Sequence, residues 1–577
     1  MTDSLDDGPS ARVDVPDAAA ALGTPPAQPP APSGLGRASA ALASGTVVSR
    51  VLGFVSAAVL AWTIGQTNQG ANAFAIANQL PNNIYAIIAG GLLSAVLVPQ
   101  IIRAAHHDDG GQRFVNRLVT LGIVVFLAVT LLATLCAPLL VALYVGQGGS
   151  ALKGGGVALA VNLAYWCLPQ IFFYAIYSLL GEVLNARGVF GPFTWAPLLN
   201  NVVAIAGLVV FAILFGVDPA HRDPASWDAA KVALLAGSAT LGVAAQALIL
   251  LVFWRRTGLT FRPDFRWRGV GLGSAGRAAA WTFGMILITQ LAGIVQSQVA
   301  QSAGEHDPSA AVLRTSWLIF MLPHSVVAVS IATPYFTRMS AHARDGQLSA
   351  VRDDLSTSLR TIILLIAGAA VALAASAIPF AAFFAHDTRE TVGISGVLLA
   401  YLVGLVPFST TFLVQRTFYA LGDTRTPFLV QLVQSGLFVG GALTVLLLRL
   451  PPSAIGAGIA IVTSLAGTVQ AVVMIALLRR RLGGIDGRLL LRRFTLYALA
   501  MIPAAVVGVL VLWGLGGLAP LGLPTIGFAL ANKVTQLVSV VIIGGATIAV
   551  YFGVLALARV PEWADLVRPL RRRLTRS

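Results

Sequence analysis

Residues 118–143 read LVTLGIVVFLAVTLLATLCAPLLVAL and contain no charged side chain. An α-helix rises about 1.5 Å per residue, so roughly 20 residues of this kind cross the apolar core of a bilayer. Within that core a chain segment must satisfy its own backbone N–H and C=O groups, which a helix does. The run therefore predicts a membrane-spanning helix.

Stretches of the same character recur along the whole chain. The composition agrees, with 57% hydrophobic residues, 11% charged residues and a mean hydropathy of +0.82. The sequence predicts an all-α polytopic membrane protein with 14 transmembrane helices. The predicted spans cover residues 40–64, 73–101, 115–143, 158–184, 194–215, 230–253, 278–301, 310–335, 357–384, 391–418, 427–448, 453–478, 494–515 and 533–557.

Positive charge falls on alternate sides of these spans. Of the 38 Lys and Arg residues, 28 lie in the even-numbered connections and the C-terminal tail. Short loops rich in Lys and Arg stay in the cytoplasm, so both termini and every even connection are expected on the cytoplasmic side of the plasma membrane. The net charge of +15 is concentrated in clusters next to span ends, such as Arg479–Arg481. We therefore expect these clusters to contact anionic membrane lipids, and we expect no nucleic-acid partner.

A weak internal repeat appears at a spacing of six spans. Leu80-Pro81 and Pro99 of span 2 match Leu322-Pro323 and Pro334 of span 8; Pro169 and Gly191-Pro192-Phe193 near span 4 match Pro407 and Thr426-Pro427-Phe428 near span 10. Six is even, so both halves have the same orientation, as in transporter folds built from parallel repeats. We predict an N-lobe (39–256), a C-lobe (257–482) and a lipid-facing helix pair (483–558). The tails are a disordered cytoplasmic segment (1–38), which lacks the features of a cleavable signal, and a basic segment (559–577).

Several prolines lie inside predicted spans, among them those at positions 81, 169, 323 and 407. Each one frees a carbonyl and bends its helix, which is tolerated only where neighbours or water satisfy the backbone. Either a packed structural kink or a moving gate explains each of them.

Several kinds of chemistry are excluded. The longest connection has about 20 residues, which leaves no room for a soluble catalytic domain, and the chain has no Walker-type phosphate loop and no HExxH-like metal spacing. We expect no enzymatic activity, no cofactor and no metal site. Cys136 and Cys167 lie within spans, and we interpret them as small apolar packing residues.

Two arginines lie more than three residues inside the ends of predicted spans. An unpaired guanidinium costs about 2.5 to 3.5 kcal/mol at the centre of a membrane helix, so Arg50 must face protein or water. It either bonds helix carbonyls or extends towards the cytoplasm, or it contacts an anion in a cavity, which we favour. Arg314 lies about one turn into span 8 and has the same two interpretations.

Polar amides concentrate in spans 2 and 7, where they either line a wet cleft or join helices by hydrogen bonds. They are Asn78, Gln79, Asn82 and Asn83 in span 2 and Gln290, Gln298 and Gln301 in span 7. Two carboxylates are further candidates. Glu182 either relays protons or, as we favour, pairs locally with Arg187. Asp423 either holds a cation or, more simply, stabilises a Gly-Asp-Thr turn.

Several motifs of this chain resemble those of the MurJ/MviN family of lipid II flippases. They are Ser49-Arg50-Val51-Leu52-Gly53-Phe54, Asn72-Ala73-Phe74, Leu80-Pro81-Asn82, Val98-Pro99 and the segment Phe418–Pro427. The resemblance extends from about residue 40 to 557. It implies two six-helix lobes around a central cavity, with two further helices that face lipid. Arg50 falls on a cavity arginine of the family, whereas Arg314 lies one helical turn before the family's span 8 arginine, which would be near Leu318.

The resemblance implies that the protein moves lipid II, the polyprenyl-diphosphate-linked peptidoglycan precursor, across a bacterial plasma membrane by alternating access. Arg50 and Arg314 would bind the diphosphate, and Asn78, Asn82, Asn83, Gln290 and Gln298 would contact the rest of the headgroup. The membrane potential, Na⁺ or H⁺ would drive the cycle, and proteins of cell-wall synthesis or division are possible partners. The alternatives are a flippase for another polyprenyl-linked glycan and a drug/cation antiporter of the same superfamily. A membrane-embedded glycosyltransferase or a scaffold is weaker, because its only acidic candidates, Asp218, Asp223 and Asp228, resemble solvated loop charges.

Overall fold

The computed structural model describes residues 35–88, 109, 111–146, 149–187, 189, 191–266, 272–518 and 527–564. These ranges are helical and contain no β-strand. The first half of the chain forms α1 (Leu35–Ile64), α2 (Gln69–Ile88), α4 (Gln112–Leu135), α5 (Ala137–Val145), α6 (Gly155–Cys167), α7 (Gln170–Ala186), α8 (Gly191–Phe215), α9 (Ala229–Trp254) and α10 (Leu272–Ala300). The second half forms α11 (Ala310–Pro323), α12 (Val329–Arg344), α13 (Leu348–Ala375), α14 (Ala377–Phe384), α15 (Thr388–Leu402), α16 (Leu405–Ala420), α17 (Arg425–Leu447), α18 (Pro452–Arg481), α19 (Gly487–Gly514) and α20 (Lys533–Leu557).

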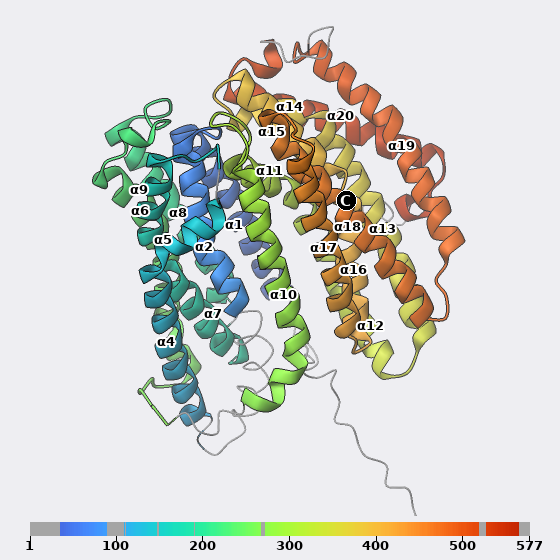
Figure 1. Cartoon of the computed structure of the whole chain (residues 1–577). Coiled ribbons are helices and arrows are strands. Elements are labelled where there is room, and N and C mark those ends of the chain that lie inside the picture. The colour runs from blue at the N-terminus through green and yellow to red at the C-terminus, as the bar shows by residue number, and fades with distance from the viewer. Residues whose placement is uncertain are drawn as a thin grey trace, which may run out of the picture.

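The helices form two bundles that lie side by side (Figure 1). The N-bundle contains α1 to α9 and the C-bundle contains α10 to α18, while α19 and α20 pack against each other and against α13. Apart from a few residues of α1 and α11 at the interface, each bundle buries its own apolar core. The predicted class, an all-α membrane protein with two lobes and an additional helix pair, is confirmed.

Eleven helices in the described ranges are long and apolar enough to cross a membrane, and a bent pair, α15 with α16, makes twelve. Helices α1 and α2 occupy the positions of the first two predicted spans. The described apolar part of α1 has only 17 residues, Val48–Ile64, and predicted span 2 continues beyond the described residues. The count of 14 spans therefore stays a prediction, and Pro99 and both predicted tails lie largely outside the described residues.

Broken helices recur at matching places in the two bundles. In the N-bundle α4 and α5 meet at Cys136, and α6 and α7 meet at Leu168 and Pro169. Six spans later, α13 and α14 meet at Ser376, and α15 and α16 are bent by 44° next to Gly404. Four predicted spans are thus helix pairs, and the shared offset supports the parallel repeat.

The prolines in these spans have different surroundings. Pro169 is the N-cap of α7 and Pro407 lies in the first turn of α16, so both occupy the start of a helix, where proline costs least. Pro323 ends α11 and precedes a π-helical turn, His324–Ala328, whereas Pro81 lies inside α2. A π-turn in the middle of a span is often found at functional positions.

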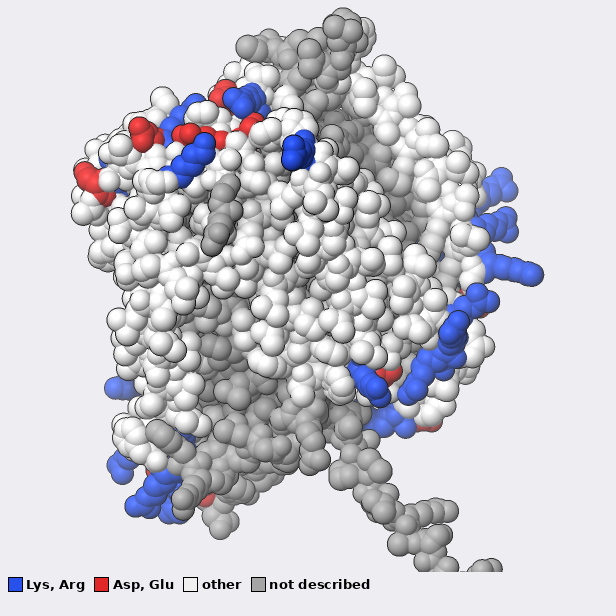
Figure 2. Space-filling model, in the orientation of Figure 1, with Lys and Arg blue, Asp and Glu red and all other residues white. Residues whose placement is uncertain are grey.

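The two ends of the molecule differ in charge. We call the end formed by connections 65–68, 216–228, 301–309 and 385–387 the outer end, because the charge pattern predicts that it faces away from the cytoplasm, and the opposite end the inner end. Acidic and basic side chains mix at the outer end, at the upper left of Figure 2, whereas Lys and Arg dominate along the lower edge.

Helices α8 and α9 approach each other closely through glycine. A Cβ atom added to Gly242 of α9 would lie 2.8 Å from the backbone oxygen of Asn200 in α8. That oxygen cannot move without the helix, so only glycine fits at this position.

We predict that Gly242→Ala lowers the free energy of unfolding by about 1 to 3 kcal/mol, because the added methyl group forces α8 and α9 apart. The thermal unfolding midpoint of the protein in detergent measures this loss. Gly440→Ala is the matched control, because its new methyl group on α17 enters open space. Equal midpoints for the two variants would contradict the prediction.

Candidate functional site

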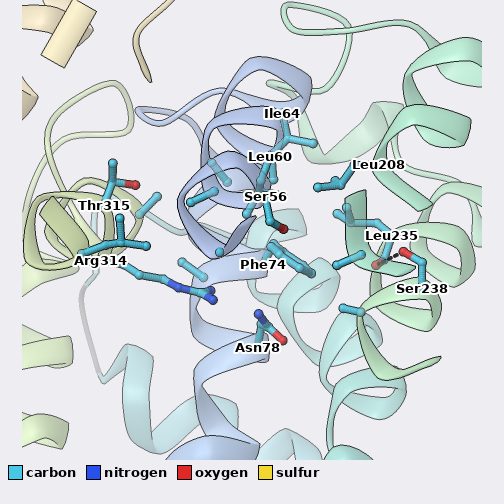
Figure 3. Close-up of a pocket in the computed structure, with 18 of the residues that line it drawn as sticks. Ser56, Leu60, Ile64, Phe74, Asn78, Leu208, Leu235, Ser238, Arg314 and Thr315 are labelled. Carbon is cyan, nitrogen blue, oxygen red and sulfur yellow. Dashed lines mark hydrogen bonds between the residues drawn. The ribbon is translucent and has the colours of Figure 1, made fainter. Parts of the chain in front are cut away.

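A cavity of about 230 Å³ lies inside the N-bundle, and α11 of the C-bundle closes one side of it (Figure 3). Helices α1, α2, α7, α8 and α9 supply the other walls. Part of the wall is apolar, and Figure 3 shows Leu60, Phe74 and Leu208 there. Its polar side chains are Ser56, Gln66, Asn78, Gln170, Tyr174, Asn200, Asn201, Ser238, Arg314 and Thr315.

Arg314 is the charged side chain of this cavity, and no other described residue of the lining carries a charge. Arg314 lies deep inside the protein. More than a third of its surface is nevertheless accessible, because the side chain faces the cavity. Figure 3 shows its guanidinium extending from α11 towards Asn78 of α2. An arginine offers only donors, so the Asn78 amide must turn its oxygen to it. That oxygen then accepts hydrogen bonds from both terminal nitrogens, at 3.0 and 3.3 Å.

Arg50 lies next to the cavity and is not part of its lining. It is exposed and precedes Gly53, a lining residue on the same face of α1, by one turn. Its positive charge acts on His324 of the C-bundle. Each bundle therefore places one cation near the other bundle: Arg50 of α1 acts on His324, and Arg314 of α11 lines the cavity of the N-bundle.

His324 begins the π-turn and is buried against the C-bundle. Its Nδ1 atom lies 3.0 Å from the hydroxyl of Ser409, and its ring contacts Phe408 and Phe412 edge-on. Reasoning from the sequence did not single out this histidine. The Pro323-His324 dipeptide in the middle of a span was the available signal.

The predicted amides have different roles. Asn78 lines the cavity, whereas Asn83 donates to the Tyr144 hydroxyl and Gln298 donates to the Leu143 carbonyl, so these two join helices. The exposed Asn82 and the half-buried Gln290 lie outside the cavity lining. A headgroup contact by any of them stays a prediction.

Sequence reasoning missed four amides of the cavity wall: Gln66, Gln170, Asn200 and Asn201. The Asn-Asn pair in span 5 was the signal for the last two.

The two candidate carboxylates lie away from the cavity. Asp423 accepts hydrogen bonds from the backbone N–H and the hydroxyl of Thr426, at 2.9 and 2.7 Å, so it stabilises the turn before α17 as the simpler interpretation held. Glu182 is half-buried on α7, where its charge reaches the Tyr85 hydroxyl of α2. Its pairing with Arg187 stays a prediction.

At the outer end, Glu390 of the C-bundle holds the loop between α1 and α2. Its Oε1 atom accepts hydrogen bonds from the backbone N–H groups of Gln66 and Thr67, each at 3.0 Å, and from the Thr67 hydroxyl at 3.2 Å. Hydrogen bonds to a charged group contribute about 1.5 to 3 kcal/mol each. Glu390 was not predicted because its position three residues after Asp387 is typical of a helix cap, and Asp387 does cap α15.

Further contacts close this end between the bundles. The Gln66 side chain accepts a hydrogen bond from Thr315 at 2.9 Å, and Asn72 accepts one from the backbone N–H of Ala311 at 3.1 Å. Gln69 donates to Glu305 at 2.9 Å. The cavity is therefore sealed on its outer side by polar contacts that can be exchanged for water. We call these contacts of Glu390, Gln66, Gln69 and Asn72 the outer closure.

The interpretation of Asp218 as a solvated loop charge was wrong. Asp218 is buried, forms an ion pair with Arg222 at 2.7 Å and lies 3.8 Å from Nδ1 of His386 in the C-bundle. Asp218 is buried because the connection after α8 folds back onto the outer closure. The local sequence does not reveal this fold-back. Asp223 and Asp228 do have local roles, because they cap the 3₁₀ turn at Pro224 and helix α9.

A two-bundle helical membrane fold with a polar chamber whose described lining contains one cation defines a transporter of the alternating-access type. Residues 60–534 match the family model for the lipid II flippase MurJ, which covers most of the chain. The chain belongs to the MurJ family. It is 28% identical over 482 residues to a protein of Rhizobium meliloti and 26% identical over 472 residues to one of Rhizobium tropici, both named "Probable lipid II flippase MurJ". These matches span 82% and 80% of this chain and 86% and 84% of those proteins.

Solved structures show the same fold. A lipid II flippase MurJ in an inward closed conformation superposes with a TM-score of 0.66 at 17% identity, over 90% of this chain and 99% of that one. An inward-facing multidrug resistance transporter of the MATE family, from the MOP superfamily, superposes with a TM-score of 0.60 at 18% identity, over 75% and 94% of the two chains.

The outer closure should depend on pH through His386. The Glu390 carboxylate, 3.8 Å away, raises the pKa of His386 above its ordinary value of 6.5, burial opposes this, and the Asp218 charge adds to it. The other charged groups nearby are Asp387, Arg222 and Lys533. Glu390 stays next to His386 in either state, because both belong to the C-bundle. Asp218 and the Trp62 carbonyl belong to the N-bundle, so their contacts with His386 are lost when the bundles part. Through these two contacts protonated His386 stabilises closure at low pH, and that stabilisation is lost as the pH rises through the raised pKa.

We predict that the closed population falls between pH 6 and pH 8.5 and that His386→Gln flattens this response. The distance between spin labels at Ala220 and Val392, in a protein without its native cysteines, measures closure. His306→Gln is the control, because His306 is an exposed histidine of the same end. A wild-type pH response in the His386 variant would refute the assignment.

Proposed function

We propose that this protein moves lipid II from the cytoplasmic to the outer leaflet of a bacterial plasma membrane by alternating access, with both termini in the cytoplasm. The observation that supports it most is the cavity, whose described lining carries one cation and no carboxylate. A guanidinium suits a diphosphate, because planar donors bind phosphate oxygens in pairs. Membership of the MurJ family supports lipid II as the particular substrate.

The two arginines act in sequence. Arg50 is exposed on the inner side of the cavity, so it meets the diphosphate first, and Arg314 receives it deeper in the chamber. Asn78 holds Arg314 in place until the substrate competes for its donors. Asn200, Asn201 and Gln170 offer hydrogen bonds to the sugar or peptide part of the headgroup.

The size of the cavity requires movement. At about 230 Å³ it is smaller than the roughly 300 to 1,000 Å³ of typical ligand pockets, and a glycopeptide headgroup exceeds it. The bundles therefore separate to admit the headgroup, and they release it outwards when the Glu390 contacts open. The polyprenyl tail stays in lipid along α19 and α20.

The cycle needs no ATP. Moving an uncompensated negative charge out of a negative interior gains about 2.3 kcal/mol per charge per 100 mV, so the membrane potential favours export. Coupling to Na⁺ or H⁺ and contacts with proteins of cell-wall synthesis or division are compatible extensions of this proposal.

A drug/cation antiporter is the second candidate, since MATE-family transporters share the fold. A cationic substrate or coupling ion needs a buried carboxylate, and the described lining of the cavity has none while Arg314 repels cations. The anionic substrate is therefore favoured.

We predict that Arg314→Ala reduces lipid II flipping by roughly 10- to 100-fold, the equivalent of losing a charged hydrogen-bonding contact of about 1.5 to 3 kcal/mol. Arg314→Lys keeps the charge without the planar pair of donors and should give an intermediate loss. The assay replaces the native protein with each variant in cells without another flippase and measures lipid II in the outer leaflet.

Arg255→Ala is the control for this assay, because Arg255 is an exposed arginine at the inner end. Normal lipid II in the outer leaflet with Arg314→Ala would defeat the proposal. Accumulation of a different lipid-linked sugar in the inner leaflet would instead identify another glycan as the substrate.

A further inference from the structure

A second hollow, of about 390 Å³, lies in the C-bundle between α13, α16, α18 and α19. Its wall is almost wholly apolar, with Ile363, Pro407, Ala471, Phe494 and Met501 among the lining residues. Val472 and Ala498 at its rim are exposed, so this groove opens to the bilayer. It shares no helix with the Arg314 cavity.

Two arginines lie at the inner end of this groove. Arg360 precedes the groove residue Ile363 by three positions on α13, and Arg493 directly precedes the groove residue Phe494 on α19, so both lie at the edge of the groove. Both pair with Glu562, which follows α20: Arg360 at 2.6 Å and Arg493 at 3.6 Å. We call these three residues the arginine cluster.

The arginine cluster carries an excess of positive charge. One carboxylate faces two guanidinium groups, which leaves a net charge of one. The Nε atom of Arg493 is buried and lies 3.6 Å from Oε1 of Glu562, too far for a normal hydrogen bond, while the Tyr497 hydroxyl interacts with the same carboxylate. Oε2 of Glu562 is buried and lacks a donor in the described part of the chain as well, so the cluster satisfies its own polar groups only in part, and Arg493 can bind a further acceptor.

The arginine cluster also lies at the depth of lipid headgroups. Predicted spans 9 and 13 begin at residues 357 and 494 and span 14 ends at residue 557, all within about five residues of the cluster. Lys and Arg side chains line the right-hand edge of Figure 2, where Figure 1 places α19. Cationic side chains at this level attract anionic headgroups.

We propose that the groove and the arginine cluster together bind one anionic phospholipid. One acyl chain fills the groove, and the phosphate accepts hydrogen bonds from Arg493 and Arg360 at its inner end. The single excess positive charge matches the single negative charge of a phosphodiester. The proposal does not depend on the transported substrate, because the site is separate from the Arg314 cavity.

The bound lipid would stabilise the α19–α20 pair and the bend between α15 and α16. It fills space between α19 and the C-bundle, and it touches Pro407 and Thr410 in the first turns of α16, next to the 44° bend from α15. Anionic lipid should therefore raise the stability of the whole protein, since a ligand that binds the folded state stabilises it.

The test measures the thermal unfolding midpoint of the purified full-length protein in detergent with added dioleoyl-phosphatidylglycerol or dioleoyl-phosphatidylcholine. We expect the anionic lipid to raise the midpoint by several degrees and the zwitterionic lipid to raise it by less than half as much. Arg493→Gln should abolish this difference. Glu562 stays paired with Arg360 in that variant, so no buried charge is left alone.

Matched variants distinguish the contribution of the lipid headgroup from that of the acyl chain. Ala498→Trp fills the rim of the groove and should remove the response to phosphatidylglycerol, while Leu499→Trp, on the neighbouring exposed position outside the groove, should keep it. Arg492→Gln, an exposed arginine next to Arg493, should keep it as well.

Three results would overturn the proposal. The first is a wild-type response in both Arg493→Gln and Ala498→Trp. The second is an equal shift with inorganic phosphate alone, which would mean that the groove contributes nothing. The third is displacement of phosphatidylglycerol by an equimolar amount of undecaprenyl phosphate, which would make a polyprenyl lipid the occupant.

Discussion

The structure depends on one constraint: a charge placed between two helix bundles in a membrane must have either a partner or water. Glu390 and Arg314 both belong to the C-bundle, and both find their partners in the N-bundle, in the Gln66 and Thr67 amides and in Asn78. Leaving either one unpaired in a dry interior would cost several kcal/mol. The bundles therefore stay together at the outer end, and they can part only where water or a substrate replaces these contacts.

The helix breaks make such parting mechanically reasonable. Breaks at Cys136, Leu168, Ser376 and Gly404 divide four spans into shorter helices, and the π-turn at His324 interrupts a fifth. Each break frees backbone groups and concentrates bending at a few residues. The outer closure, by contrast, consists of side chains whose hydrogen bonds water can replace. Rigid cores, defined break points and an exchangeable polar seal are the elements that alternating access requires.

Much of the site could be predicted only as a set of candidates. Arg314 and Asn78 were named from their position in spans, and the structure places them in contact, while Asn83 and Gln298 have the same chemistry and join helices instead. An amide in a helix has the same local signal in either role. The difference depends on which helix packs against it, and a single sequence does not contain that information. Asp218 was misread for the same reason: it is buried next to residues that are distant in the sequence, such as His386.

Sequence alone determined the class of fold, the approximate positions of the spans, the two-lobe organisation and the motifs of the family. It did so because hydropathy, charge bias and proline position act locally, through the free energy of inserting each segment into lipid. Tertiary structure alone decided which polar residues meet: Arg314 with Asn78, Glu390 with the α1–α2 loop, and Arg360 with Glu562. These pairs are separated by 200 residues or more and depend on how the helices pack, which insertion energies do not specify.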